Sequence, residues 1–205
     1  IPSACTALLG PDYCLIADEY NNPYFASRER SGEVKRVLIY FGGVDQYNLS
    51  ALCLDVFSIA ELKHIFLDIV IGPMNKNYDA LSIAADRRGN ATLYASVPNL
   101  AHLMSTADLA LGAGGVTTWE RMRLGLPSMI ITIAENQMLG AEALSSDNLV
   151  TYLGFHTEIT RSSLESAIAS KLSNPAEILN QSLAGRDLVD GMGVSRIIDC
   201  MNSFT

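Results

Sequence analysis

The stretch DLALGAGGVTTWERMRLGLPSMIITIAENQ, residues 108–137, decides the fold. Its apolar residues at 109–111 form a run too short for a helix and are typical of a buried strand. Helical spacing begins at Thr117 or Thr118 and extends to Leu124, where Gly125 and Pro127 end it. Residues 129–133 are apolar and mostly β-branched, which indicates a second buried strand. The stretch therefore predicts a strand, a glycine loop, a helix and a strand.

The glycine loop of this unit contains Gly112, Gly114 and Gly115. A tight turn between a strand and a helix N-terminus presents free backbone N–H groups, and phosphate is the anion that such turns usually bind. The spacing matches neither the dinucleotide fingerprint nor the P-loop. Glycine loops that bind nothing are also common in α/β folds, so a purely structural turn is the alternative.

Glu120 lies a few residues into the predicted helix, where its carboxylate can reach back over the ligand face of the loop. Ribose hydroxyls need an acceptor at such a position. A carboxylate in the first helical turn is also favoured by the helix dipole alone, so Glu120 has a structural alternative as well.

The composition indicates a globular chain of one domain or two small ones. Of the 205 residues, 49% are hydrophobic and 18% are charged, which allows a substantial core. The formal net charge of −8 argues against nonspecific binding to nucleic acid or to anionic membranes. No apolar run reaches membrane-spanning length, so we expect no stable membrane insertion. Four scattered cysteines and three histidines show no metal spacing, which predicts free thiols in a reducing cytoplasm and no metal site.

Apolar runs and helical patterns alternate along the rest of the chain. The expected strands are residues 37–41, 65–71, 91–95, 109–111, 129–133 and 150–153. The expected helices are residues 48–62, 78–87, 98–104, 117–124, 136–146, 161–173, 175–189 and 194–201. This alternation predicts an α/β, Rossmann-like fold, in which helices flank a mostly parallel sheet of about six strands.

A second glycine turn, Gly42-Gly43-Val44-Asp45, follows the strand expected at 37–41. It lies at the carboxyl end of that strand, which is where α/β folds place their ligands. The alternative for Asp45 is that it only caps the helix that follows.

Several motifs, spread in order over nearly the whole chain, resemble the C-terminal domain of the UDP-sugar hydrolases of pseudaminic acid biosynthesis. These enzymes remove UDP from a diacetamido-trideoxy-altrose and are similar to the peptidoglycan N-acetylglucosaminyltransferase of GT-B fold. The matching pieces are Gly10-Pro11-Asp12-Tyr13, Phe41 to Asp45, Val70 to Pro73, Ala107 to Gly115, Thr118 to Arg121, Gly125 to Ser128, Asn136-Gln137, and Val189 to Gly193. The resemblance implies that residues 1–205 are one nucleotide-sugar-binding domain, the C-terminal half of a GT-B fold.

The resemblance also implies roles for individual residues. The diphosphate would bind to the loop that contains Gly112, Gly114, Gly115, Thr117 and Thr118, and the ribose would bind to Glu120. The uracil would face the segment that contains Val97 and Asn99, and the sugar or a phosphate would face Asn136 and Gln137. The cleft would also be lined by Gly42, Gly43 and Asp45. Helix capping is the alternative for Thr117, Thr118 and Asn136. On their helical positions we expect Trp119 to pack in the core and Arg121 and Arg123 to be solvated.

The implied reaction is hydrolysis at the anomeric carbon, and the histidine that activates water in such enzymes lies in their N-terminal domain. His64, His102 and His156 match no motif, so we assign no catalytic residue and no cofactor to this chain. The opening at Ile1 suggests a piece of a longer protein, which we expect to bind UDP or a UDP-sugar weakly and to be inactive without its N-terminal domain. A glycosyltransferase domain and a noncatalytic nucleotide-sensing domain are the alternatives.

One departure from the family leaves the sugar open. The family shows a run ending in an arginine after its Gly-x-x-Tyr motif, whereas here the acidic pair Asp18-Glu19 follows Ala17. Another nonulosonic acid or a surface polysaccharide therefore remains a possible product of the pathway.

Overall fold

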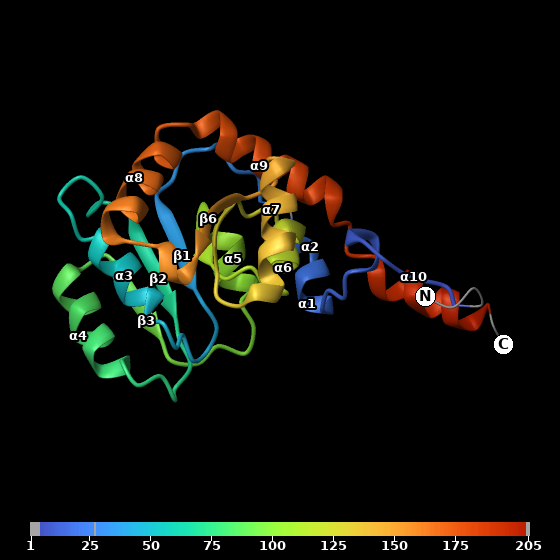
Figure 1. Ribbon diagram of the computed structural model, residues 1–205, viewed down its shortest axis with the longest axis horizontal. Helices are drawn as coiled ribbons and strands as arrows, with labels where there is room; N and C mark the ends of the chain where they lie inside the picture. The colour runs from blue at the N-terminus through green and yellow to red at the C-terminus, as the bar shows by residue number, and fades with distance from the viewer. Residues whose placement is uncertain (1–4, 27, 204–205) are drawn as a thin grey trace.

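The fold is a six-stranded sheet between two layers of helices (Figure 1). The structure, a computed structural model, describes residues 5–26 and 28–203. The strands are β1 (Arg36–Tyr40), β2 (Phe66–Val70), β3 (Ala91–Tyr94), β4 (Leu109–Gly112), β5 (Ser128–Thr132) and β6 (Thr151–Phe155). They are ordered β3-β2-β1-β4-β5-β6 and every neighbouring pair is parallel. The predicted α/β fold with a parallel sheet is therefore confirmed.

Ten α-helices and three short 3₁₀ helices are present in the described residues. The α-helices are α1 (Asp18–Asn21), α2 (Pro23–Ala26), α3 (Leu49–Val56), α4 (Tyr78–Arg88), α5 (Ala101–Thr106), α6 (Thr117–Arg123), α7 (Met138–Ser146), α8 (Arg161–Leu172), α9 (Pro175–Leu188) and α10 (Gly193–Asn202). The 3₁₀ helices are η1 (Pro11–Tyr13), η2 (Glu135–Gln137) and η3 (His156–Glu158).

Alternate side chains of each strand enter two separate cores. Val37 and Ile39 of β1 pack with α3, α4 and α8 on one face, whereas Leu38 between them packs with α5, α6 and α7 on the other. A sheet buried on both faces needs strands that are apolar at almost every position, which is what made these strands recognisable in the sequence.

The first predicted helix, expected over 48–62, ends earlier than predicted. α3 stops at Val56, and residues 57–64 form turns. Two side chains satisfy the carbonyl groups at this point: the Ser58 hydroxyl donates to Leu54 O at 2.6 Å, and Arg88 Nε donates to Phe57 O at 3.1 Å. Arg88 comes from α4, so the stop signal is not local, and helical spacing alone overestimated the length.

The chain changes direction at β1. It runs outward from β1 through β2 to β3 and then returns to the other side of β1 as β4. The loops after β1 and β4 therefore diverge, which leaves a crevice at the carboxyl edge of the sheet. Both glycine turns of the sequence lie at this switch point.

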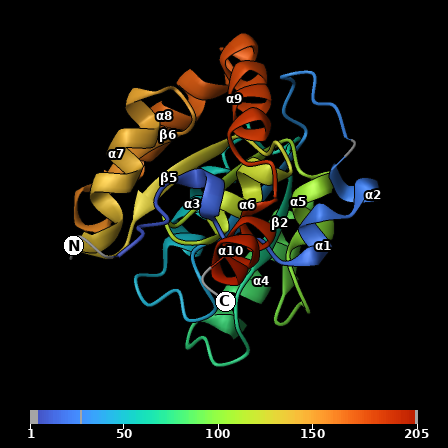
Figure 2. The same ribbon diagram turned by 90° about the vertical axis from the view of Figure 1, so that its right-hand side faces the viewer.

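The N-terminal segment packs against the side of the domain where the sheet is covered by α5 and α6. Figure 2 shows α1 and α2 beside α5, and α1 also contacts α6. α10 lies next to η1 and projects from the body of the domain (Figure 1). None of the helices described here is long and apolar enough to cross a membrane.

Candidate functional site

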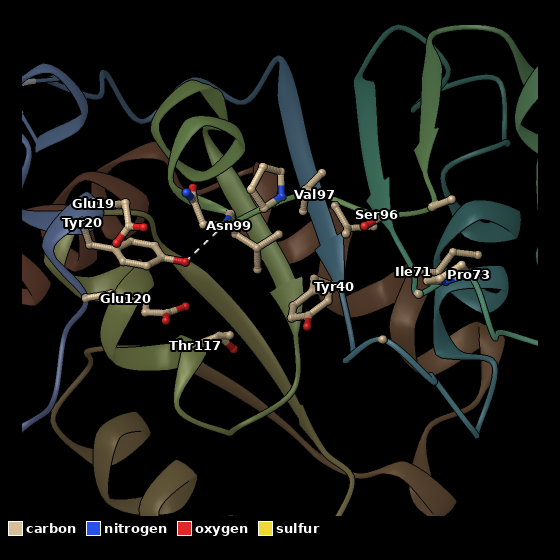
Figure 3. A pocket seen from close by; sticks show the side chains of 17 residues that line it. Glu19, Tyr20, Tyr40, Ile71, Pro73, Ser96, Val97, Asn99, Thr117 and Glu120 are labelled. Carbon is tan, nitrogen blue, oxygen red and sulfur yellow. Dashed lines mark hydrogen bonds between the residues drawn. The ribbon is translucent and has the colours of Figure 1, made fainter.

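A pocket of about 470 Å³ opens at the carboxyl edge beside the switch point (Figure 3). We call it the Glu120 pocket. Its walls come from the ends of β1, β2 and β3, the segment 95–100, the start of α6, and residues 17–20 of the N-terminal segment. Five of the predicted site residues line it: Gly43, Val97, Asn99, Thr117 and Glu120.

A second, smaller hollow of about 260 Å³ lies at the same glycine loop. We call it the Gln137 hollow. It brings together five further predicted residues: Gly114, Gly115, Thr118, Asn136 and Gln137. Gly42, Asp45 and Gly112 line neither cavity. Ten predicted residues therefore line one of the two cavities beside the glycine loop, and the other three line neither cavity.

Glu120 is half-buried in the fourth position of α6, and Figure 3 shows its carboxylate between Tyr20 and Thr117. Burial raises the pKa of Glu120 above its ordinary value, while the Tyr20 hydroxyl and the charge of Arg121 lower it. A partly desolvated carboxylate that faces a pocket is a strong acceptor for ligand hydroxyl groups. This geometry agrees with the ribose role without testing it.

Arg121, which we expected to be solvated, is 1% exposed, so that prediction was wrong. Its Nη2 donates to Ala113 O and to the Thr118 hydroxyl, both at 2.9 Å. The guanidinium lies directly behind the glycine loop, and an ideal Cβ on Gly112 would be 2.3 Å from Arg121 Nη1. Because Gly112 has no side chain, the Arg121 guanidinium has room to pack against the backbone there. Burial lowers the pKa of Arg121 to about 10, which is still fully charged at neutral pH.

The backbone N–H groups of the glycine loop take no part in the hydrogen bonds to Arg121. Within the described residues, the N–H groups of 114–117 donate to no protein acceptor, and the first bonds of α6 begin with Thr118 N to Gly115 O at 2.9 Å. α6 has only seven residues, so its dipole adds less than a long helix would. The free amides are the main feature of this loop that can bind an anion.

The loop after β1 is held differently. Gly42 has φ +92°, a left-handed conformation that favours glycine. Asp45 is buried, and its two carboxylate oxygens accept from Leu49 N at 3.0 Å and Ser50 N at 2.9 Å. The capping alternative therefore accounts for both oxygens of Asp45.

The three predicted amide side chains differ in how free they are. Asn99 Oδ1 accepts from Ala101 N at 3.0 Å and so helps to cap α5. Gln137 Oε1 accepts from Ile133 N at 3.0 Å, which leaves its Nε2 group beside Gly115. Asn136 is exposed and makes no side-chain hydrogen bond within the described chain. The threonines divide similarly, because Thr118 accepts from Arg121 whereas Thr117 faces the Glu120 pocket.

Sequence analysis assigned no role in the site to four polar side chains of the pocket: Glu19, Tyr20, Tyr40 and Ser96. Tyr20 is 4% exposed, and its hydroxyl accepts from Leu100 N at 3.4 Å (Figure 3). The only signal in the sequence was that the acidic pair Asp18-Glu19, directly before Tyr20, stands where the family has an arginine. Trp119 is partly buried against the core of its layer, as expected.

The electrostatics of the pocket are acidic. Glu19 and Glu120 line it, and no lysine, arginine or histidine is among the described residues at its wall. Throughout residues 5–26 and 28–203 there is also no group of three or more histidine, cysteine or acidic side chains that is placed to hold a metal ion. An anionic ligand would therefore depend on backbone amides and hydroxyl groups of this chain.

The profile of the family described as "Glycosyltransferase family 28 C-terminal domain" matches residues 36–190, from the start of β1 to the turn after α9. This chain belongs to that family. The match includes all six strands, both glycine turns and Glu120.

Among curated proteins, this family member is similar to the spore coat polysaccharide biosynthesis protein SpsG of Bacillus subtilis, with 23% identity over 193 residues. The match covers 92% of this chain and 56% of SpsG. The chain therefore spans little more than half the length of that relative.

Solved structures show the same fold. MurG of Acinetobacter baumannii superposes with a TM-score of 0.68 at 18% identity, over 86% of this chain and 54% of MurG. The UDP-GlcNAc 2-epimerase of Neisseria meningitidis, bound to UDP-GlcNAc, gives a TM-score of 0.60 at 15% identity, over 91% of this chain and 48% of that one. At these identities the likeness shows the GT-B C-terminal fold and nothing finer.

Proposed function

We propose that this chain is the UDP-binding domain of a nucleotide-sugar hydrolase that releases UDP from a diacetamido-trideoxy-hexose. The pathway would be nonulosonic acid or surface polysaccharide biosynthesis. The single observation that carries the nucleotide part is the placement of Glu120, one turn after a loop with four free amide groups and in the wall of a pocket. A nucleoside diphosphate has a matching order of groups, with ribose hydroxyls next to an anion.

In this proposal each part of the site binds one part of the ligand. The amides of 114–117 and the Thr117 hydroxyl bind the diphosphate, and Glu120 accepts from the ribose hydroxyls. The wall around Val97 and Asn99 faces the uracil, and the Gln137 hollow faces the sugar. The glycine loop does not need a nearby cation, because backbone amides can supply much of the stabilisation of the phosphate charge.

The comparisons support the class of ligand and of pathway. The matched profile is that of a glycosyltransferase domain, the epimerase of this fold was solved with UDP-GlcNAc, and SpsG is named for polysaccharide biosynthesis. The chain covers about half of these proteins. We therefore propose that residues 1–205 form one domain and that a second domain of the same protein supplies the group that activates water.

Calorimetric titration of the purified chain with UDP, and with CDP and ADP as controls, tests the nucleotide part. We expect UDP to bind most tightly. Glu120→Ala should weaken UDP binding roughly 10- to 100-fold, the usual effect of losing a hydrogen bond to a charged group. Glu142→Ala, which removes an exposed carboxylate from α7, is the matched control and should leave the affinity unchanged. Equal affinity for the three nucleotides would contradict the proposal.

A glycosyltransferase domain is the second candidate, and the family profile favours it. The two candidates share the nucleotide site and differ in the group that attacks the sugar. The full-length protein should release UDP from a UDP-sugar without an added acceptor if it is a hydrolase, and only with an acceptor if it is a transferase. The 205-residue chain should release no UDP in either case. Detectable turnover by this chain alone would contradict the proposal that a second domain supplies the catalytic group.

A further inference from the structure

Two sequence motifs have no role in the proposed site: Gly10 to Tyr13 and Val189 to Gly193. They meet in space although they are about 180 residues apart. Arg196 Nη1 donates to Asp12 O at 3.0 Å, and η1 packs against α10. An ideal Cβ on Gly193 would be 2.2 Å from Cys14 O, so this contact requires a glycine. We call residues 10–14 together with 189–196 the terminal clamp.

The terminal clamp extends to α1 through Asn21. Asn21 Nδ2 donates to Gly191 O at 3.1 Å, and Asn21 Oδ1 accepts from Arg123 Nε at 2.7 Å. Gly191 has φ +80°, and a Cβ on it would be 1.9 Å from Asn21 Oδ1. α1 is therefore tied on one side to the clamp and on the other side to α6, the helix that contains Glu120.

α1 contains Tyr20, which lines the Glu120 pocket. The ring of Tyr20 is buried in the core beside α5, and its hydroxyl accepts from Leu100 N at 3.4 Å. The Glu120 carboxylate lies on the same wall of the pocket, where Tyr20 lowers the pKa of Glu120 and Glu120 raises the pKa of Tyr20. A phenol that accepts from the Leu100 amide still has its own proton, which it can donate to the nearby carboxylate. Figure 3 shows the hydroxyl and the carboxylate on the same wall of the pocket.

The charged and titratable groups around Glu120 come from three elements. Tyr20 and Glu19 face it from α1, Tyr40 from β1, and Arg121 follows it on α6. Burial raises the pKa of Glu120, and the Tyr20 hydroxyl is the first of the two effects that oppose this rise. Burial and the Glu120 charge both raise the pKa of Tyr40, which therefore stays neutral.

We propose that Tyr20 is a positioning residue for Glu120, and that the terminal clamp sets the place of Tyr20. One carboxylate oxygen of Glu120 is held by the Tyr20 hydroxyl, so the other is directed into the pocket, where a ribose hydroxyl can donate to it. The ribose part of this proposal rests on the proposed function. The contact between Tyr20 and Glu120 does not, and it can be measured without a ligand.

Tyr20→Phe tests the contact because it retains the buried ring and removes only the hydroxyl. The carboxyl carbon of Glu120, followed by ¹³C NMR in a pH titration of the full chain, should titrate at higher pH in the variant than in the wild type. UDP affinity should fall roughly 3- to 10-fold, the range of a single lost hydrogen bond. Affinity for 2′,3′-dideoxyuridine diphosphate, which lacks both ribose hydroxyls, should stay the same. In a Glu120→Ala background, where no acceptor remains, the Tyr20→Phe change should cost no further affinity.

Gly191→Ala tests the clamp, with Gly89→Ala as the matched control. Both glycines have positive φ, +80° and +66°, so both substitutions strain the backbone. A Cβ on Gly89 meets nothing within 4 Å, whereas one on Gly191 would displace Asn21. We expect only Gly191→Ala to raise the titration of Glu120 and to weaken UDP binding.

Each outcome decides part of the proposal. An unchanged Glu120 titration in Tyr20→Phe overturns the contact, whatever UDP does. A shifted titration with unchanged UDP affinity overturns the positioning role. If Gly191→Ala behaves like Gly89→Ala, the clamp does not set Tyr20. If the wild type binds no UDP, both the ribose role and the proposed function are wrong, while the titration still decides whether Tyr20 holds Glu120.

Discussion

The two glycine loops at the switch point look alike in sequence but are built in different ways. The loop after β1 uses its own polar groups internally: Gly72 N donates to Gly43 O at 2.6 Å, and the Asp45 carboxylate caps α3. The loop after β4 is supported from behind by the buried guanidinium of Arg121, which binds Ala113 O and the Thr118 hydroxyl.

The difference lies at the start of the following helix, because, within the described residues, the N–H groups of 42–47 in the first loop also donate to no protein acceptor. In the first loop a carboxylate already occupies the amides at the start of the helix. In the second loop the support comes from a side chain that bonds to a carbonyl and a hydroxyl, so the amides of 114–117 remain free. Free amides alone therefore do not distinguish the two glycine turns; the Asp45 carboxylate at the start of α3 does, because its charge disfavours an anion there.

The largest effect should come from removing the support of the second loop. Arg121→Met replaces the buried guanidinium with an apolar chain and leaves Ala113 O and the Thr118 hydroxyl without their donor. We expect the free energy of unfolding to fall by about 2–4 kcal/mol, as for other losses of a buried hydrogen-bond network. Urea denaturation measures this loss, and Arg87→Met, at an exposed position of α4, is the control. Equal stability of the two variants would mean that the arginine is not the support of the loop.

A smaller effect is expected where the first loop approaches β2. An ideal Cβ on Gly72 would be 2.6 Å from Gly43 O, whereas one on Gly43 would be 3.7 Å from Gly72 Cα. Because backbone atoms must move in the first case only, Gly72→Ala should cost about 1–3 kcal/mol of stability. Gly43→Ala is the matched partner and should cost much less. Similar midpoints in urea for both variants would show that the close approach is not maintained in solution.

Asp45→Asn separates the two interpretations of Asp45. Asparagine tolerates the left-handed backbone of this residue, φ +40°, but loses one of the two acceptors that cap α3. We expect a loss of about 1 kcal/mol of stability, as for other capping substitutions, with unchanged UDP affinity. If the affinity falls tenfold while the stability is unchanged, Asp45 belongs to the ligand site and the contrast between the loops fails.

The smallest effect concerns the charge of Glu120 itself. Because burial raises its pKa in the folded state, the protonated form is favoured there. Its contribution to stability is therefore complete below the pKa of the unfolded chain and is lost as the pH rises through the folded pKa. Glu120→Gln should then unfold at a slightly higher temperature than the wild type at pH 7, although it binds UDP more weakly, and the temperature difference should disappear in acid. Thermal unfolding between pH 3 and 8 measures this, and a lower unfolding temperature at pH 7 would contradict it.

Most of the fold could be predicted because its signals are local. The strands of a parallel sheet are continuously apolar, and glycines mark their carboxyl ends, so all six strands were found within about two residues. The end of α3 was missed because its stop depends on Arg88 from α4. Arg121 was assigned to the surface because a charged residue in a helix is usually exposed, and no local pattern indicates that a glycine loop needs a guanidinium behind it.

By itself the sequence determined the mostly parallel sheet, the two glycine turns at the carboxyl ends of strands, and the position of Glu120 just after one of these turns. All of these follow from hydrophobic period and glycine spacing over fewer than about 20 residues. Only the tertiary structure decided that the Asp45 carboxylate caps α3, that Arg121 lies behind the second loop, and that Tyr20 lines the pocket of Glu120. The last of these depends on segments about 100 residues apart, whereas the first two depend on contacts within about eight residues whose side-chain directions no apolar or glycine pattern encodes.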